Sequence, residues 1–119
     1  MEREELIEIL RTHNQFARGL PGGKRADLRL KDISNNKLDG ANLEGALLAG
    51  AILSKCSLKK ANFKDADLYG ADLTEADLSG ANLTSADLRG TRLTGANLRD
   101  NLVRSKPSTG GHRTHPLSM

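Results

Sequence analysis

Apolar residues recur at every fifth position over about two thirds of this chain. From residue 26 to residue 105 the sequence divides into sixteen consecutive five-residue units, and the third place of every unit is apolar. Alanine holds the first place in eleven units and Cys56 in a twelfth, Asp or Asn is the commonest second residue, and Gly is the commonest fifth. The third-place residues, which we predict to form the core, are Leu28, Ile33, Leu38, Leu43, Leu48, Leu53, Leu58, Phe63, Leu68, Leu73, Leu78, Leu83, Leu88, Leu93, Leu98 and Val103.

A period of five suits neither regular helix nor regular strand. On an α-helix, residues five apart are rotated by about 140°, so the leucines would spread around the circumference. In a strand, an odd spacing sends successive leucines to opposite faces. The leucines converge only if the backbone turns a corner every five residues and coils around an axis. The small first residue then faces inward, the second and fourth face water, and the fifth lies at the corner, where Gly adopts an unusual φ readily.

Side chains and neighbouring coils are expected to satisfy the backbone of such a tube. Asp or Asn beside a corner bonds nearby backbone groups, and stacked coils pair about 4.8 Å apart.

Units such as 71–75 (Ala-Asp-Leu-Thr-Glu) and 81–85 (Ala-Asn-Leu-Thr-Ser) resemble the pentapeptide-repeat family, whose unit is A-(D/N)-L-x-x. The resemblance implies an all-β solenoid, a right-handed quadrilateral β-helix with 20 residues per coil and four coils over residues 26–105. Two columns fit a 20-residue period, namely Asn42, Asn62, Asn82 and Ser34, Ser54, Thr74, Thr94.

Residues 2–18 predict an amphipathic helix that precedes the repeats. The apolar stripe at helical periodicity consists of Leu6, Ile9, Leu10, His13, Phe16 and Ala17. Gly19 and Pro21 are expected to end the helix, with Gly22 and Gly23 as a hinge into the coils. We therefore interpret residues 1–25 as an N-terminal cap on the first coil. A membrane-surface helix is disfavoured because the polar face is acidic rather than basic.

The C-terminal end of the repeats has no helical cover in the sequence. Residues 106–119 lose the repeat, are rich in Gly, Pro, Ser and Thr, and predict a disordered tail. Units at both ends depart from the pattern, as terminal coils of solenoids do; the inward first place is held there by Lys31, Asn36, Thr91 and Asn101. An open apolar end is a liability, so we expect this end to pack against a second copy, giving a homodimer, or against another protein.

Composition and charge exclude several classes of protein. The 119 residues contain no Trp, one Tyr and two Phe, so the core must be aliphatic. A net charge of +3 is too small for a dedicated nucleic-acid binder. The single cysteine, Cys56, excludes an internal disulfide, and no apolar run approaches a membrane span of about 20 residues. The acidic start after Met1 is unlike a secretory signal, so we expect a soluble, cytoplasmic protein.

Nothing in the sequence predicts catalysis, a cofactor or a metal. The recurring carboxylates follow the second-place pattern and are expected to be solvated or bonded at corners; they include Asp67, Asp72, Asp77 and Asp87. His112 and His115 have no third ligand nearby. His13 is expected to pack in the helix stripe, and Cys56 to behave as a small inward hydrophobe. We therefore predict that the protein is not an enzyme.

One activity implied by the resemblance is protection of DNA gyrase by an acidic rod-like dimer that imitates duplex DNA. Successive 20-residue coils from residue 26 carry side-chain charges of −1, +3, −4 and +2. Imitation of DNA requires continuous negative potential, which this alternation does not supply. A DNA-mimicking modulator of gyrase, a type II topoisomerase, is therefore the alternative interpretation.

A different surface feature favours protein binding. Leu47 and Ile52 occupy second places that are usually polar, and a 20-residue coil places Leu47 near Ala49 and beneath Tyr69. A contiguous exposed apolar cluster marks a protein-binding patch. We therefore predict a rigid protein–protein interaction scaffold with an unidentified protein partner.

Overall fold

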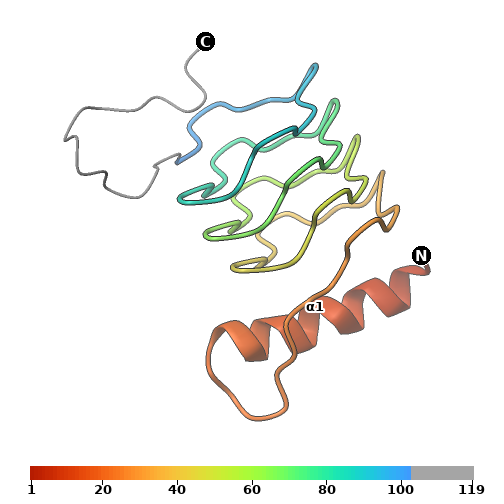
Figure 1. Ribbon diagram of the computed structural model, residues 1–119, viewed down its shortest axis with the longest axis vertical. Coiled ribbons are helices and arrows are strands. Elements are labelled where there is room, and N and C mark those ends of the chain that lie inside the picture. Colours follow the sequence, from red (N-terminus) through yellow and green to blue (C-terminus); the bar gives the residue numbers. More distant parts are fainter. Residues whose placement is uncertain (103–119) are drawn as a thin grey trace, which may run out of the picture.

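The computed structural model describes residues 1–102, which comprise one helix followed by a stack of flat coils (Figure 1). Helix α1 spans Arg3–Ala17. The coils contain no continuous strand among these residues; twelve isolated parallel bridges join second-place residues 20 positions apart, beginning with Asp27–Leu47 and ending with Asn82–Leu102. Each coil therefore contains 20 residues, but each side contributes one bridge residue where an all-β solenoid predicts strands. Val103 and the predicted tail lie outside the described residues.

A tight turn forms every corner of the coils. At all but two described corners the third-place carbonyl accepts a hydrogen bond from the first-place N–H of the next unit, as Leu38 O does from Ala41 N at 3.0 Å. All fifteen fifth-place residues from 30 to 100 have positive φ. Positive φ confined to the third turn residue is the signature of a type II turn. Seven of these positions are Gly, and the other eight are Leu30, Asn35, Lys55, Lys60, Asp65, Glu75, Ser85 and Asp100.

Hydrogen bonds between stacked coils use three N–H groups of an interior unit. In residues 46–50, the N–H of Leu47 donates to the carbonyl of Ala26 in the coil below at 3.0 Å. The N–H groups of Leu48 and Gly50 donate to Asp67 and Tyr69 in the coil above, both at 2.8 Å. The turn uses the first-place N–H. The ladder therefore leaves the fourth-place N–H of each unit without a backbone acceptor.

The second-place side chain supplies that missing acceptor. In all ten described units with Asp or Asn at the second place, Oδ1 accepts a hydrogen bond from the fourth-place N–H, two residues later. Asp72 accepts from Thr74 at 2.9 Å and Asn82 from Thr84 at 3.0 Å. Buried or half-buried N–H groups are costly when unpaired. This local bond therefore gives a physical reason for the preference for Asp and Asn.

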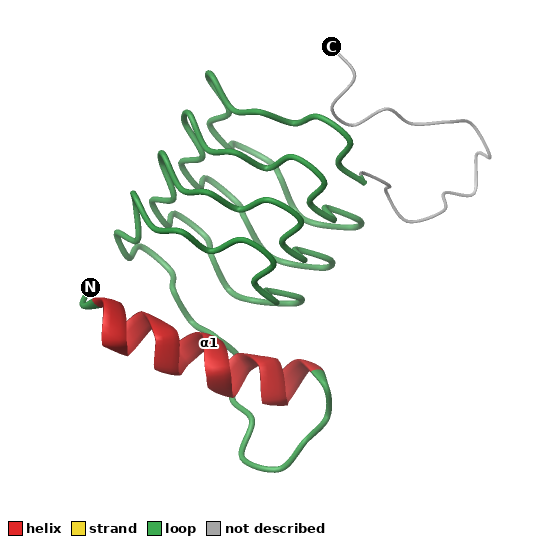
Figure 2. Ribbon diagram, turned by 180° about the vertical axis from the view of Figure 1, so that it is seen from behind, coloured by secondary structure: helices red, strands yellow, loops and turns green. Residues whose placement is uncertain are grey.

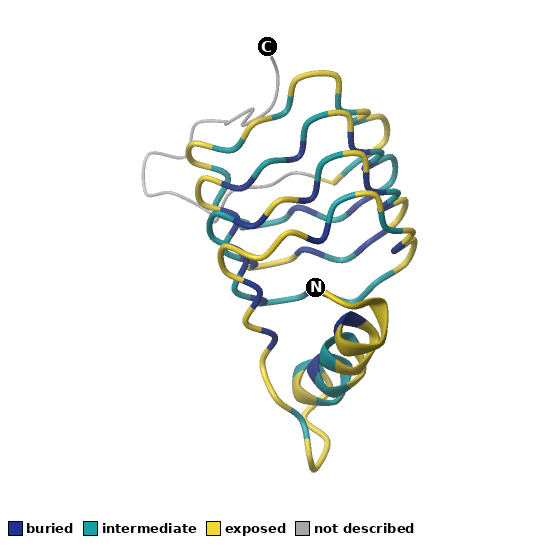
Figure 3. Cartoon of the chain, turned by 90° about the vertical axis from the view of Figure 1, so that its right-hand side faces the viewer, coloured by how far each residue is buried: buried dark blue, intermediate teal, exposed yellow. Residues whose placement is uncertain are grey.

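The third-place side chains fill the inside of the stack. The buried ones are Leu28, Ile33, Leu38, Leu43, Leu48, Leu53, Leu58, Phe63, Leu68, Leu73, Leu78 and Leu83. Leu88, Leu93 and Leu98 of the last coil are only partly buried, and no residue from 84 to 102 is fully buried (Figure 3). Of the polar first-place residues, Lys31 is exposed rather than inward, whereas Thr91 donates to the carbonyl of Leu68 at 3.1 Å.

Helix α1 lies against the first coil (Figure 2). Leu6 and His13 are buried, and Ile9 and Leu10 pack against the core as partly buried residues. Phe16, predicted in the same stripe, is instead 38% exposed. Its ring lies near the helix C-terminus, where Arg25 stacks on it at 5.2 Å from the ring centroid.

The loop after α1 holds a specific conformation. Gly19 N donates to Phe16 O at 3.0 Å and Leu20 N to Gln15 O at 2.8 Å, the Schellman pattern that ends helices. Gly23, interpreted from the sequence as part of a hinge, crosses the helix backbone closely. A Cβ at Gly23 would lie 2.2 Å from the Phe16 nitrogen. Glycine at this position therefore allows the loop to cross α1 in direct contact with the helix backbone.

Candidate functional site

One side of the coil stack carries an apolar centre between charged ends. It consists of residues 26–30, 46–50, 66–70 and 86–90, aligned by the bridges between second-place residues. We call this the Tyr69 side. Its fourth-place residues, from the N-terminal coil to the C-terminal one, are Arg29, Ala49, Tyr69 and Arg89. Aromatic and arginine side chains around an apolar centre are typical of protein-binding surfaces.

A hollow of about 640 Å³ opens at the corner of this side. We call it the corner hollow; its walls include Leu30, Ala49, Gly50 and Tyr69. Tyr69 is 54% exposed and Leu30 is 81% exposed. Leu30 was not predicted as a site residue, although a leucine at a fifth place, which usually holds Gly or a polar residue, was a visible departure from the pattern.

The predicted patch is divided by the structure. Ala49 and Tyr69 line the corner hollow. Leu47 lines a second hollow of about 420 Å³ with Phe16 and Arg25. Ile52 is 37% exposed on the adjacent side and lines neither hollow. The structure therefore brings Ala49 and Tyr69 together with Leu30, places Leu47 beside them along the same coil, and separates Ile52.

Paired charges flank the apolar centre of the Tyr69 side. Arg29 contacts Asp27 at 2.7 Å, and Arg89 contacts Asp87 at 2.8 Å. The Arg29 guanidinium lowers the pKa of Asp27 to about 2, chiefly by hydrogen bonding. Arg89 also lies over the Tyr69 ring, 5.4 Å from its centroid. Both aspartates are therefore ionised at neutral pH and already partnered.

Four second-place residues within residues 26–100, Lys37, Leu47, Ile52 and Arg92, lack the side-chain oxygen found in most units. Leu47 and Ile52 are the two apolar ones. Because Leu47 and Ile52 have no acceptor, the N–H groups of Ala49 and Ser54 have no hydrogen-bond partner within residues 1–102. In the flanking coils, Tyr69 N donates to Asp67 at 3.0 Å and Arg29 N to Asp27 at 3.2 Å. Ala49 N–H is thus an unused donor on the Tyr69 side.

The other residues considered from the sequence have structural surroundings. Cys56 is buried, its thiol donates to Ile33 O at 3.1 Å, and burial raises its pKa. Asp72, Asp77 and Asp87 each accept a hydrogen bond from the backbone N–H two residues later. The pKa of each is lowered, chiefly by the side-chain bonds from Thr74 and Arg89 for Asp72 and Asp87, and by the backbone bond from Ser79 for Asp77. Over the described part of the chain, no three His, Cys, Asp or Glu side chains gather as a metal site. His112 and His115 lie outside it.

The 20-residue bridge register and the Asp or Asn bond in the repeated unit can be compared with known proteins. Residues 32–65 and 61–100 match pentapeptide repeats, in eight copies. The chain belongs to the pentapeptide-repeat family. Members of this family form right-handed quadrilateral β-helices and are generally structural or interaction proteins.

The helix of the described chain is too short and too polar to cross a bilayer.

Solved pentapeptide-repeat structures resemble this chain over its coils. A pentapeptide repeat protein of the Arabidopsis thaliana thylakoid lumen is 39% identical, with a TM-score of 0.66 over 71% of this chain and 59% of that protein. This chain therefore spans less than two thirds of that relative. QnrB1, a plasmid-mediated fluoroquinolone resistance protein, is 23% identical with a TM-score of 0.51 over 67% of this chain and 47% of its own, a likeness of fold alone. No curated protein matches the sequence.

Proposed function

We propose that this protein is a non-enzymatic scaffold that binds another protein through the Tyr69 side, with α1 as the N-terminal cap of the coil stack. The observation that carries the proposal is the exposed Tyr69 beside the corner hollow, with Arg89 stacked on its ring. Tyr and Arg are enriched among the residues that dominate binding energy at interfaces.

The rigidity of the coils supports this role. Every described unit is held by hydrogen bonds within its turn or to the adjacent coils, so the backbone that carries the outward side chains keeps a fixed shape. A preorganised surface loses little conformational freedom on binding.

The cytoplasmic location of the protein stays a prediction.

Capture from the native host tests the scaffold proposal. Immobilised wild-type protein is compared with a Tyr69→Ser variant and with Arg99→Ser, a matched exposed fourth-place change on another side. We expect a partner that the Tyr69→Ser variant loses and the Arg99→Ser variant retains, and that binds the purified protein in calorimetry. Failure to find any protein that binds the purified chain in a fixed ratio would contradict the proposal.

Modulation of DNA gyrase is a weaker candidate. The charge of the coils alternates in sign, and the likeness to QnrB1 concerns the fold alone. A supercoiling assay in which an excess of this protein leaves gyrase unaffected would exclude it.

Self-association through the C-terminal coil is a further part of the proposal. Leu88, Leu93 and Leu98 are only partly buried there, and Leu102 is exposed. We expect sedimentation to detect a dimer that weakens in a Leu93→Asp variant. A monomer at all concentrations would contradict self-association.

A further inference from the structure

We propose that the corner hollow binds an acidic segment of the partner protein, with an apolar side chain in the hollow and a carboxylate beside it. This inference rests on the proposed scaffold function and specifies the chemistry of the partner. It follows from the shape of the hollow, the charges around it and the unused N–H of Ala49.

The shape of the hollow comes from the fifth-place column at this corner. Gly50 and Gly70 have no side chains, so the surface is recessed between Leu30 and Tyr69. The Leu30 side chain leans over Gly50, since a Cβ there would lie 2.6 Å from Leu30 Cδ2. Apolar and aromatic walls around a recess of this kind suit one large apolar side chain.

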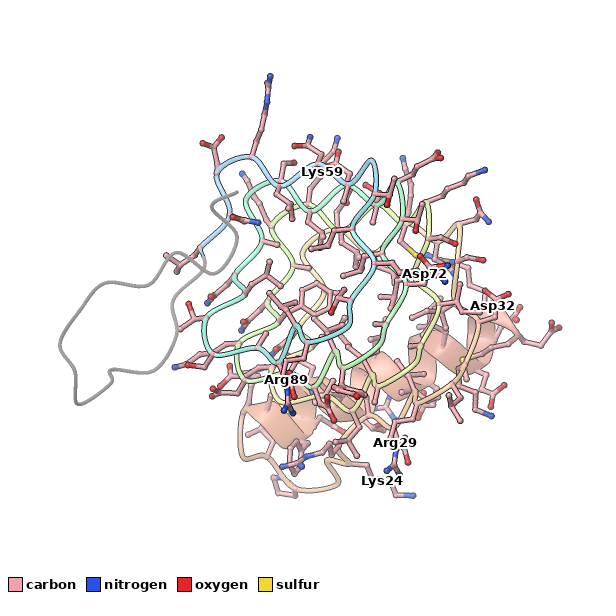
Figure 4. All side chains as sticks on the ribbon, turned by 45° about the horizontal axis from the view of Figure 1, so that its top comes forward. Lys24, Arg29, Asp32, Lys59, Asp72 and Arg89 are labelled. Atoms are coloured by element: carbon pink, nitrogen blue, oxygen red, sulfur yellow. The ribbon has the colours of Figure 1, made fainter. Side chains whose placement is uncertain are left out.

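The charges around the hollow favour an anion. Its lining includes Asp27, Arg29 and Lys31, a net charge of +1. Asp27 is already paired with Arg29, whereas Lys31 makes no ion pair within residues 1–102. Arg29 and Arg89 lie on the same side of the molecule as Lys24, away from Asp32 and Asp72 (Figure 4). Arg29 and Arg89 are already paired with aspartates, so Lys31 supplies the uncompensated charge at the hollow. A carboxylate near Lys31 gains favourable electrostatic interactions.

The acceptor missing at Leu47 identifies the group that the partner supplies. In the coils on either side, an aspartate oxygen accepts the fourth-place N–H at 3.0 and 3.2 Å. Ala49 N–H has no such partner, and Ala49 lines the hollow. A carboxylate oxygen from the partner would complete the same bond. Hydrogen bonds to a charged acceptor are stronger than neutral ones.

The second hollow sets the direction of the segment. Glu44, Asp65 and Asp67 line it, with Arg25 held over Phe16. Acidic residues of the partner are repelled from this end and attracted to the Lys31 end. The acidic residues of the segment therefore lie on the Lys31 side of its apolar anchor.

Synthetic peptides test this inference on the full-length protein. The probes are fluorescent twelve-residue peptides with one Leu or Phe next to Asp-Glu pairs, and the same peptides with Asn-Gln or Lys-Lys in place of the acids. We expect the acidic peptides to bind at least tenfold more tightly than the amide peptides, with affinity falling as salt rises. In ¹H–¹⁵N spectra the Ala49 amide signal should shift. Equal affinity for acidic and amide peptides, or no binding by any, overturns the inference.

A pair of variants separates binding from folding. Leu47→Asn provides Ala49 N–H with an internal acceptor, so it should raise the melting temperature while weakening the acidic peptide at least fivefold. Ile52→Asn is the matched control, because it provides the same acceptor for Ser54 N–H outside the hollow. It should raise the melting temperature and leave affinity unchanged. Unchanged affinity in Leu47→Asn contradicts the role of Ala49.

Results with the captured host partner distinguish the two proposals. Loss of that partner in both Tyr69→Ser and Lys31→Glu supports the acidic segment. A partner that is lost in Tyr69→Ser but bound normally by Lys31→Glu and by Leu47→Asn overturns the acidic segment and leaves the scaffold function standing. Peptide binding without any captured partner supports the hollow as a site and contradicts the wider function.

Discussion

The imidazole of His13 donates from Nε2 to the backbone carbonyl of Glu44 at 2.7 Å and thereby joins α1 to the first coil. Its Nδ1 accepts the N–H of Ala26 at 2.9 Å. Both ring nitrogens of the neutral imidazole are therefore hydrogen-bonded. Protonation of Nδ1 would place its N–H against the N–H of Ala26, and that hydrogen bond would be lost. Burial lowers the pKa of His13, and the nearby Arg25 lowers it further, against the opposing influence of Glu44.

Acidification should therefore weaken the attachment of α1. Because the folded pKa of His13 lies below its unfolded value of about 6.5, its contribution is complete above that pH and is lost as pH falls through the folded pKa. We expect the free energy of unfolding to fall below pH 6.5 with a slope of at most about 1.4 kcal/mol per pH unit. Urea unfolding measures it. A double variant, His112→Gln with His115→Gln, should keep this slope, and His13→Gln should lose it.

Removal of a buried leucine from a middle coil should be costly. Leu73→Ala is expected to lower the free energy of unfolding by about 2 to 5 kcal/mol because the cavity cannot collapse in a stack held from both sides. Leu98→Ala in the last coil, where the side chain is only partly buried, should cost less. Urea unfolding compares the two. A cost below about 1 kcal/mol for Leu73→Ala would contradict its burial inside the stack.

The hydrogen bond from Ser79 to Asp77 should survive replacement of Asp77 by Asn but not by Ala. Asp77→Ala removes the acceptor and should cost about 0.5 to 1.5 kcal/mol, whereas Asp77→Asn retains it. The backbone bond from Ser79 lowers the pKa of Asp77, so the carboxylate stabilises the fold above about pH 4 and this contribution is lost as pH falls further. Unfolding curves of Asp77→Asn should vary less between pH 5 and 2 than those of the wild type. Parallel pH profiles would argue against the lowered pKa.

Substitution by alanine should be tolerated at Gly40 but should disrupt the loop at Gly23. Gly40→Ala meets no atom within 4 Å, so only its φ of +72° opposes the change; we expect a loss of about 1 kcal/mol. Gly23→Ala would place a Cβ against the backbone of Phe16 and should separate the loop from α1. Hydrogen exchange of α1 amides measures the difference. Faster exchange after Gly40→Ala than after Gly23→Ala would contradict the packed crossing.

The repeated part of the fold was predictable because its information is local. The spacing of Leu28, Leu48 and the other third-place residues determines which side chains face inward, and the second-place Asp or Asn bonds its own unit. Lys60 and Glu75 adopt positive φ like their glycine counterparts, so the corner geometry is imposed by the stack rather than by glycine. The repeat phase therefore predicts the corners even where the corner residue is not Gly.

The candidate site was predicted less completely. Tyr69 and Ala49 were predicted because a 20-residue coil places them beside Leu47, which departs from the repeat, but Leu30 was missed and Ile52 falls outside the hollow. The shape of the hollow depends on how Leu30 leans over Gly50, and side-chain orientation across coils is absent from a one-dimensional pattern. Phe16 was misplaced for a similar reason, since Arg25 offers its ring an alternative contact at the surface.

The 20-residue register of the bridges constrains how genes for such proteins can change in length. Duplication of residues 46–65 would lengthen the tube and leave every later residue on its original side. Insertion or loss of five codons would turn everything after it by a quarter revolution, moving Tyr69 and Arg89 away from Arg29. Evolution can therefore lengthen this protein in whole coils while a binding surface on one side is retained.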